Sequence, residues 1–171
     1  MRRYIFSFMC ALLLLTLNSV AGAQTRSFTS QAVDYTLELP NATWRAVSRP
    51  DSVHQHTEFV YGDRADGLLR VRKEVVDANT ALSALARRDQ DMKLRFLPGY
   101  VEGKQESFAG RLPAITTSYE YTAGGKPMSG RVYYLQTDNR TIYALHFTGA
   151  RDKLNRIRNQ TDSIVRSFQL K

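Results

Sequence analysis

Apolar and polar residues alternate with a period of two along most of this chain, and this pattern predicts β-strands with one buried face. The clearest run is VDYTLEL at 33–39, which a Pro-Asn turn pair ends. The other predicted strands cover 43–47, 53–61, 68–76, 112–122, 128–137 and 141–148. Short turn sequences join the last three, so we expect an antiparallel meander there. We expect a hairpin loop at 62–67.

Helical spacing replaces this alternation in two segments. The first is predicted to begin near Asn79 or Thr80, either of which can cap the free amides of an opening turn, and to end at about Phe96. Its packed face is expected to hold Leu82, Leu85, Ala86, Met92 and Phe96. The second covers 152–168, and its expected packed face holds Leu154, Ile157, Thr161, Ile164, Val165 and Phe168.

This order of elements predicts an α+β fold, because strands surround one helix and a second helix ends the chain. We expect a central antiparallel β-sheet of about six to seven strands, packed with amphipathic helices in an α/β/α sandwich. The sequence contains no internal repeat and no linker long enough to divide it.

The first residues of the chain are typical of a secretory signal peptide. A pair of arginines precedes a mostly apolar run over 5–17, and Ala21 and Ala23 supply the small residues that a signal peptidase requires. The apolar run is shorter than the roughly 20 residues that span a bilayer. We therefore expect a signal peptide over 1–23, with cleavage after Ala23.

The mature chain, 24–171, is long enough for a domain with its own core, and we predict a single domain without a transmembrane segment. The only cysteine is Cys10, which would leave with the signal and lacks the small neighbours of a lipid-attachment site. A disulfide framework, a thiolate metal site and a cysteine nucleophile are therefore excluded from the mature chain. An export signal without disulfides favours a periplasmic or extracellular location in a bacterium.

Four segments of the mature chain resemble the PsbP-like superfamily, and their order along the chain resembles it as well. The segments are YTLELPNATW, FAGRLPAITTSYEY, YALHFTGA and the closing IVRSF, within 28–171. This superfamily includes an extrinsic subunit of the plant photosystem and exported bacterial proteins of unknown role, the DcrB-like group among them. The resemblance implies an antiparallel sheet covered by helices, with Trp44 buried against it, in proteins that bind partners and share no catalytic residues.

Catalytic motifs are absent from the sequence. It has no Gly-x-Ser-x-Gly elbow, no glycine-rich phosphate loop and no His-Glu-x-x-His. Ser129 can be nominated as a nucleophile only if a histidine lies beside it, and the histidines are His54, His56 and His146. His146 alternates with apolar residues and should share a strand face with Ala144. We expect no enzyme, and an uncharacterised hydrolase is the weaker alternative.

A metal site is the other chemistry that these histidines suggest. His54, His56 and Glu58 stand at alternate positions of a predicted strand, so they should point to one side while Val53 and Phe59 point to the other. Imidazole and carboxylate groups suit Zn²⁺ or Cu²⁺. An exposed strand face supplies no second partners for the ring nitrogens, so we expect adventitious metal binding at most and no cofactor.

The chain is basic, with 24 Lys and Arg against 16 Asp and Glu and a formal charge of +8. Export argues against nucleic acid as the partner, whereas anionic lipid and cell-wall polymers are plausible contacts of a basic envelope protein.

We expect a non-catalytic binding protein that contacts a partner protein of the bacterial cell envelope. The alternative is a small-ligand or metal carrier in the periplasm. A pocket lined by Tyr and Arg would favour the carrier, and a flat exposed apolar patch would favour the protein partner. The sequence assigns no ligand-binding residues.

Overall fold

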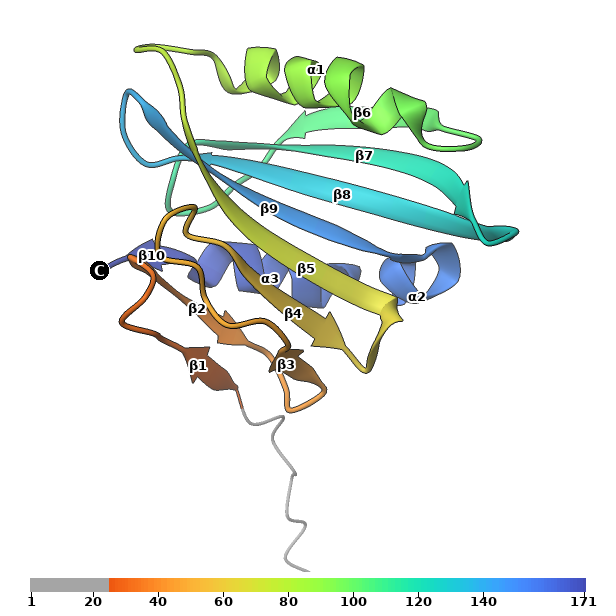
Figure 1. The fold of residues 1–171 in the computed structure, drawn as a ribbon, viewed down its shortest axis with the longest axis horizontal. Coiled ribbons are helices and arrows are strands. Elements are labelled where there is room, and N and C mark those ends of the chain that lie inside the picture. The colour runs from red at the N-terminus through yellow and green to blue at the C-terminus, as the bar shows by residue number, and fades with distance from the viewer. Residues whose placement is uncertain (1–24) are drawn as a thin grey trace, which may run out of the picture.

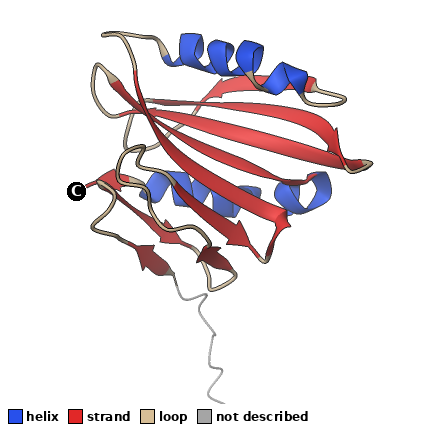
Figure 2. Ribbon diagram, in the orientation of Figure 1, coloured by secondary structure: helices blue, strands red, loops and turns tan. Residues whose placement is uncertain are grey.

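The computed structural model describes residues 25–171, and Figures 1 and 2 show their arrangement. The predicted signal peptide over 1–23 lies outside these residues. The described elements are β1 (Arg26–Phe28), β2 (Tyr35–Leu39), β3 (Trp44–Ala46), β4 (Thr57–Tyr61), β5 (Asp63–Val75), α1 (Leu82–Met92), the 3₁₀ turn η1 (Leu94–Phe96), β6 (Val101–Ser107), β7 (Ala114–Ala123), β8 (Lys126–Gln136), β9 (Thr141–Ala150), α2 (Arg151–Arg156), α3 (Arg158–Ser167) and β10 (Gln169–Leu170). None of the helices within 25–171 is both long enough and apolar enough to cross a bilayer.

Seven of the strands form one antiparallel sheet, in the order β3-β4-β5-β9-β8-β7-β6. The expected meander is confirmed, because β8 pairs with β7 on one side and with β9 on the other. The long strand β5 pairs with β9 and so joins the early β4–β5 hairpin to the meander. A smaller sheet has the order β1-β2-β10. The predicted α+β fold is confirmed.

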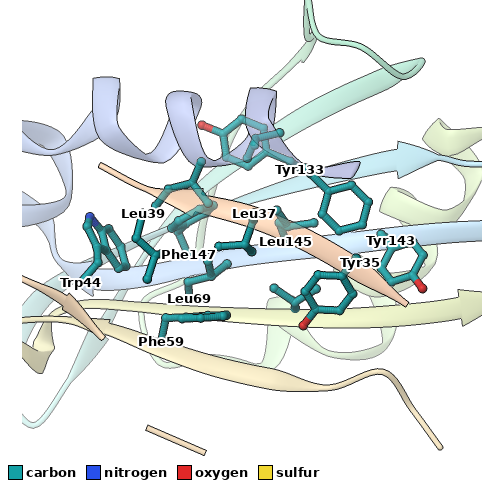
Figure 3. Packing of buried hydrophobic residues seen from close by; sticks show 14 of the residues in the cluster. Tyr35, Leu37, Leu39, Trp44, Phe59, Leu69, Tyr133, Tyr143, Leu145 and Phe147 are labelled. Carbon is teal, nitrogen blue, oxygen red and sulfur yellow. The ribbon is translucent and has the colours of Figure 1, made fainter. Parts of the chain in front are cut away.

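The larger core lies between the main sheet and the layer made by α2, α3 and the small sheet (Figure 3). Trp44 is fully buried there, as expected, and its indole Nε1 donates a hydrogen bond of 3.0 Å to Gln160 Oε1 on α3. The spacing of the last helical segment is also confirmed. All residues of its expected packed face are buried: Leu154, Ile157, Thr161, Ile164, Val165 and Phe168. The segment is nevertheless two helices, because the backbone breaks at Ile157.

A second core lies on the opposite face of the main sheet, beneath α1 (Figure 1). Leu85 and Ala86 of α1 are buried there against Tyr134 of β8. Asp89 completes the contact, since its carboxylate accepts hydrogen bonds from Arg72, Lys93 and Tyr134. A buried carboxylate is stable only with such partners, so Asp89 holds α1 to the sheet.

The expected start and packed face of the first helix are partly wrong. Neither Asn79 nor Thr80 caps α1, because Asn79 has a positive φ of 64° and the Thr80 hydroxyl donates to Asp77 O instead. Met92 and Phe96 are 70% and 74% exposed. The α-helix ends at Met92 and a 3₁₀ turn follows, so the helical spacing no longer carries these side chains onto the sheet.

The predicted strand 53–61 begins at Thr57, because the preceding residues form a turn in which Gln55 has a φ of 54°. Val53 is therefore exposed rather than buried. The expected loop 62–67 is largely strand, since β5 begins at Asp63 and Gly62, with a φ of 68°, makes the tight turn. The strands β1, β6 and β10 were not predicted.

Candidate ligand-binding site

A pocket of ≈ 270 Å³ lies beneath the C-terminal end of α1, on the sheet face that this helix covers. We call it the α1-face pocket. Its walls come from β5, β8 and β9 of the sheet, from α1 and the residues that follow it, and from His56 just before β4. The lining residues are His56, Arg70, Arg72, Asp89, Lys93, Leu94, Val132, Tyr134, Ala144 and His146.

Strand register brings the polar and apolar parts of this pocket together. Arg70 of β5 is paired with His146 of β9, which is paired in turn with Val132 of β8. Residues two apart in a strand share a face, so Arg72 and Ala144 lie in the adjacent row. The prediction that His146 and Ala144 share a face is confirmed.

The basic side chains of the pocket are held in place by carboxylates. Arg70 Nε lies 2.9 Å from Glu58 Oε1, and Lys93 Nζ lies 2.8 Å from Asp89 Oδ1. Arg72 Nη2 lies 3.1 Å from the other oxygen of Asp89. Burial works to raise the pKa of Glu58, but hydrogen bonds from Arg64 and Arg70 outweigh it and leave the pKa below its usual value. Glu58 therefore stays charged and fixes Arg70.

The lining itself carries three cationic side chains and one carboxylate. Glu58 stands behind Arg70 and is not a lining residue. Arg72 also pairs with Glu74, its Nε lying 2.5 Å from Oε1, so each of the three cations has a carboxylate partner. The pocket therefore offers guanidinium and ammonium donors without an excess of positive charge, while Leu94, Val132 and Ala144 give it an apolar surface.

A histidine–tyrosine pair closes one end of the pocket. Tyr119 Oη and His146 Nε2 are 2.6 Å apart and share a hydrogen bond. Burial lowers the pKa of His146 to about 4, and the charges of Arg70 and Arg72 act in the same direction. Burial also raises the pKa of Tyr119. Both groups are therefore neutral at pH 7, and His146 adds a polar but uncharged edge to the pocket.

Gly130 makes this pair possible. A Cβ atom at Gly130 would lie 2.1 Å from Cζ of the Tyr119 ring, well inside van der Waals contact. The absence of a side chain on β8 lets the Tyr119 ring cross the strand and reach His146.

Of the three residues considered as metal ligands, His56 and Glu58 lie near each other and His54 lies apart from them. His54 lies in the turn before β4, is 73% exposed and contacts Asp51 at 2.7 Å. His56 Nε2 lies 3.8 Å from Glu58 Oε1, and His56 lines the α1-face pocket. Within 25–171 no group of three or more His, Cys, Asp or Glu side chains is placed to hold a metal ion.

Ser129 and His146 do not form a catalytic pair, because they lie on opposite faces of the sheet. Ser129 is two residues from Arg131 and four from Tyr133, so it shares their strand face, and Tyr133 belongs to the core beneath α2 and α3.

The sequence analysis did not predict the α1-face pocket. The two-residue spacing of Arg70 and Arg72 indicated that both side chains share a strand face, but no pattern in the sequence indicated that Lys93 would lie beside them.

The fold can be compared with known proteins. No family model matches the sequence, and no curated protein matches it either. Solved structures do match, and they define a PsbP-like fold, which confirms the sequence resemblance at the level of the fold. Cyanobacterial PsbP (CyanoP) from Synechocystis is 14% identical, with a TM-score of 0.59 over 92% of this chain and 99% of that one.

Two further structures show the same likeness. LpqN of Mycobacterium tuberculosis, which is involved in cell envelope biogenesis in that organism, is 15% identical, with a TM-score of 0.55 over 86% of this chain and 91% of that one. A protein from Bacteroides thetaiotaomicron is 11% identical, with a TM-score of 0.58 over 86% of this chain. This chain spans about half of that protein, 49% of its length.

Proposed function

We propose that this protein is a non-catalytic binding protein whose α1-face pocket takes up a small organic anion with an apolar part. The observation that carries the proposal is the convergence of Arg70, Arg72 and Lys93 over an apolar surface. A pocket lined by Tyr and Arg is also the feature that favours a ligand carrier over a protein-contacting surface. The small-ligand carrier, which was the alternative function in the sequence analysis, therefore becomes the first candidate.

The charge arrangement supports an anion. Guanidinium groups bind carboxylates through two parallel hydrogen bonds, and Arg70 and Arg72 present two such groups from neighbouring positions of one strand face. Their carboxylate partners restrict the side chains before binding, which lowers the entropy cost of association.

The size and lining of the pocket support a small molecule with an apolar group. Its ≈ 270 Å³ is slightly below the range of roughly 300–1,000 Å³ that is common for ligand pockets. A cavity of about 150 Å³ holds benzene. A ring or short alkyl chain would lie against Leu94, Val132 and Ala144 while its acidic group meets the arginines.

The side chains in and beside the α1-face pocket support binding rather than catalysis. His146 and Tyr119 share their hydrogen bond with each other, and the lining contains no serine, threonine or cysteine that could serve as a nucleophile beside them.

Benzoate tests the proposal, because it joins a carboxylate to a ring of suitable size. Isothermal titration is expected to show saturable binding to the protein, and Arg70→Gln should weaken it about tenfold, since a hydrogen bond to a charged group is lost. Arg64→Gln is the matched control. Arg64 also pairs with Glu58, at 2.8 Å, but does not line the pocket, so its replacement should leave the affinity within about twofold.

Two results would contradict this function. One is the absence of saturable heat with benzoate in a protein that unfolds cooperatively. The other is an equal loss of affinity in Arg64→Gln and Arg70→Gln, which would indicate a general charge effect rather than a pocket contact.

A partner protein of the cell envelope is the second candidate, and one observation favours it. Met92 and Phe96 are strongly exposed on either side of Lys93 and Leu94, which line the pocket. A contiguous exposed apolar patch is a mark of a protein contact site, and these two side chains would form part of such a patch. The envelope role of LpqN points in the same direction. A protein contact through Met92 and Phe96 would survive Arg70→Gln, so the same variant separates the two candidates.

We further propose that the protein is exported to the periplasm or cell exterior. The secreted form is expected to begin at Gln24 and to carry no lipid, because Ala21 and Ala23 fit the cleavage rule. N-terminal sequencing and intact mass of protein recovered from the cell envelope test this. Acylated Cys10, or a mature form that retains the apolar run over 5–17, would contradict it.

A further inference from the structure

The main sheet ends in a strand whose outer edge is open to solvent. β6 lies last in the strand order, and within residues 25–171 it pairs with β7 alone (Figure 1). All seven of its residues are exposed. An edge strand presents a row of backbone donors and acceptors to which another strand can add. The backbone phase and the side chains of β6 therefore decide which strand fits there.

The hydrogen bonds of β6 to β7 show which of its backbone groups point outward. Phe108 N donates to the first carbonyl of β7 at 3.0 Å, and Lys104 N donates to the Ser118 hydroxyl at 3.1 Å. In an antiparallel pair, residues that bond the neighbouring strand alternate with residues whose N–H and C=O point the other way. Gln105 and Ser107 occupy the alternate positions, so their backbone groups point away from β7.

The side chains on either side of Gln105 carry opposite charges. Lys104 precedes it and Glu106 follows it, and both are exposed. Neither makes an ion pair within residues 25–171, whereas Glu102 of the same strand lies 4.0 Å from Arg87. In reverse order Lys-Gln-Glu is Glu-Gln-Lys, so this segment is complementary in charge to an antiparallel copy of itself.

From these features we propose that β6 pairs with β6 of a second copy of this chain, about a two-fold axis at Gln105. Gln105 then faces Gln105 of the partner subunit, and the outward N–H and C=O groups of the two residues bond each other. Lys104 faces Glu106 of the partner subunit, and symmetry repeats that contact. This charged pair is of the non-hydrogen-bonded kind, in which Cα atoms lie only about 4.5 Å apart and side chains are closest.

The other registers that keep the backbone groups in phase have no such match. A shift that pairs Gln105 with Ser107 of the partner subunit puts Glu106 opposite itself, and like charges directly opposite are unfavourable. A further shift, which pairs Ser107 with itself, brings no opposite charges together. An edge lysine commonly opposes strand pairing. Here Lys104 selects one register instead, because Glu106 of the partner subunit meets it only there.

This pairing gives one continuous sheet across both subunits. The two-fold axis is perpendicular to the sheet, so both α1 helices lie on one face, and the two α1-face pockets lie on the same side of the dimer. A bulge between Glu102 and Gln105 limits the pairing to a few residues. Such a contact is smaller than the roughly 1,200 Å² of stable interfaces, so we expect a transient dimer.

Sedimentation velocity measures the association. Between about 10 μM and about 1 mM protein, it is expected to show a reversible equilibrium of monomer and dimer. Amide hydrogen exchange then locates the contact. Exchange at the Gln105 amide should slow in proportion to the fraction of protein that is dimeric, because this N–H is bonded only in the dimer.

Gln105→Pro tests the backbone contact. It removes the outward donor at the axis but no hydrogen bond to β7, so Tm should stay close to that of the unaltered protein. Dimerisation should weaken at least about tenfold, because two symmetric hydrogen bonds are lost. Gln105→Ala is the matched control. It keeps the N–H and should dimerise as the unaltered protein does.

Charge reversal tests the register. Lys104→Glu places two carboxylates opposite each other at both symmetric contacts, and Glu106→Lys places two ammonium groups there. Each single variant should weaken dimerisation about tenfold, and the double variant should restore it, because the charges are exchanged but still matched. Both positions are exposed, so this series tests the proposal even if Gln105→Pro lowers Tm.

A protein that stays monomeric at about 1 mM would overturn the proposal. So would a dimer that the single charge reversals leave as stable as before, or that the double variant fails to restore. Unweakened dimerisation of a folded Gln105→Pro would have the same meaning. A dimer in which the Gln105 amide is not protected would place the contact elsewhere on the surface, and this result too would overturn the pairing through β6.

Discussion

A chain that ends before Asp152 is expected to lose cooperative unfolding altogether. The deleted segment contains α2, α3 and β10, and these cover one face of the main sheet (Figure 1). Five large apolar side chains of the segment are buried in the larger core: Leu154, Ile157, Ile164, Val165 and Phe168. Their removal exposes the aromatic side of the sheet to water.

The expected loss of folding stability follows from the cost of removing each buried side chain. Truncating one large buried residue costs about 2–5 kcal/mol. Five such losses reach or exceed the roughly 5–15 kcal/mol of total stability that a domain of this kind has. The deletion also removes β10, the partner of β2 in the small sheet.

Thermal unfolding followed by near-ultraviolet circular dichroism measures this outcome, since the technique reports fixed aromatic packing. A shorter deletion, of Leu170 and Lys171 alone, is the control and should retain a cooperative transition because both residues are exposed. A chain ending at Arg151 that still unfolds cooperatively near the original temperature would show that the helices are a detachable tail.

The parts of the fold that the sequence predicted are those in which burial sets the residue pattern. The meander β7-β8-β9 was predicted because alternate residues such as Tyr133 and Leu145 face a core. The packed face of α2 and α3 was predicted for the same reason, and it kept its spacing across the break at Ile157.

The parts that were not predicted are those held by backbone hydrogen bonds rather than by buried side chains. All seven residues of β6 are exposed, so its sequence, VEGKQES, carries no alternation. The strand exists because it pairs with β7 at the edge of the sheet. In the same way β1 and β10 are short, and each is paired with β2 alone.

The α1-face pocket was not evident from the sequence, because it is assembled from segments far apart in the chain. Arg70 and Arg72 meet Lys93 only after α1 packs on the sheet through Asp89. The residue pattern within one strand or one helix contains no information on contacts between segments that are far apart in the chain.

Replacing Trp44 with alanine is expected to destabilise the protein by about 3–5 kcal/mol, the usual cost of removing a fully buried aromatic side chain. The indole packs edge-on against Phe147, with ring centroids 6.1 Å apart (Figure 3). It also packs against Tyr61, with ring centroids 5.4 Å apart. The alanine variant would leave a cavity between β3 and α3, and the strand ends around it are too constrained to close it fully.

Urea unfolding measures the loss, and Trp44→Phe divides it into two parts. Phenylalanine keeps most of the ring volume but removes the Nε1 donor to Gln160 Oε1. That oxygen still accepts a hydrogen bond from Asn41 Nδ2 at 3.0 Å, so it is not left without a partner. We therefore expect Trp44→Phe to cost about 1–2 kcal/mol, mainly in lost packing and one hydrogen bond.

A loss below about 1 kcal/mol for Trp44→Ala would contradict the burial of Trp44. Equal losses in both variants would place the stabilising contribution in the hydrogen bond to α3 rather than in the core.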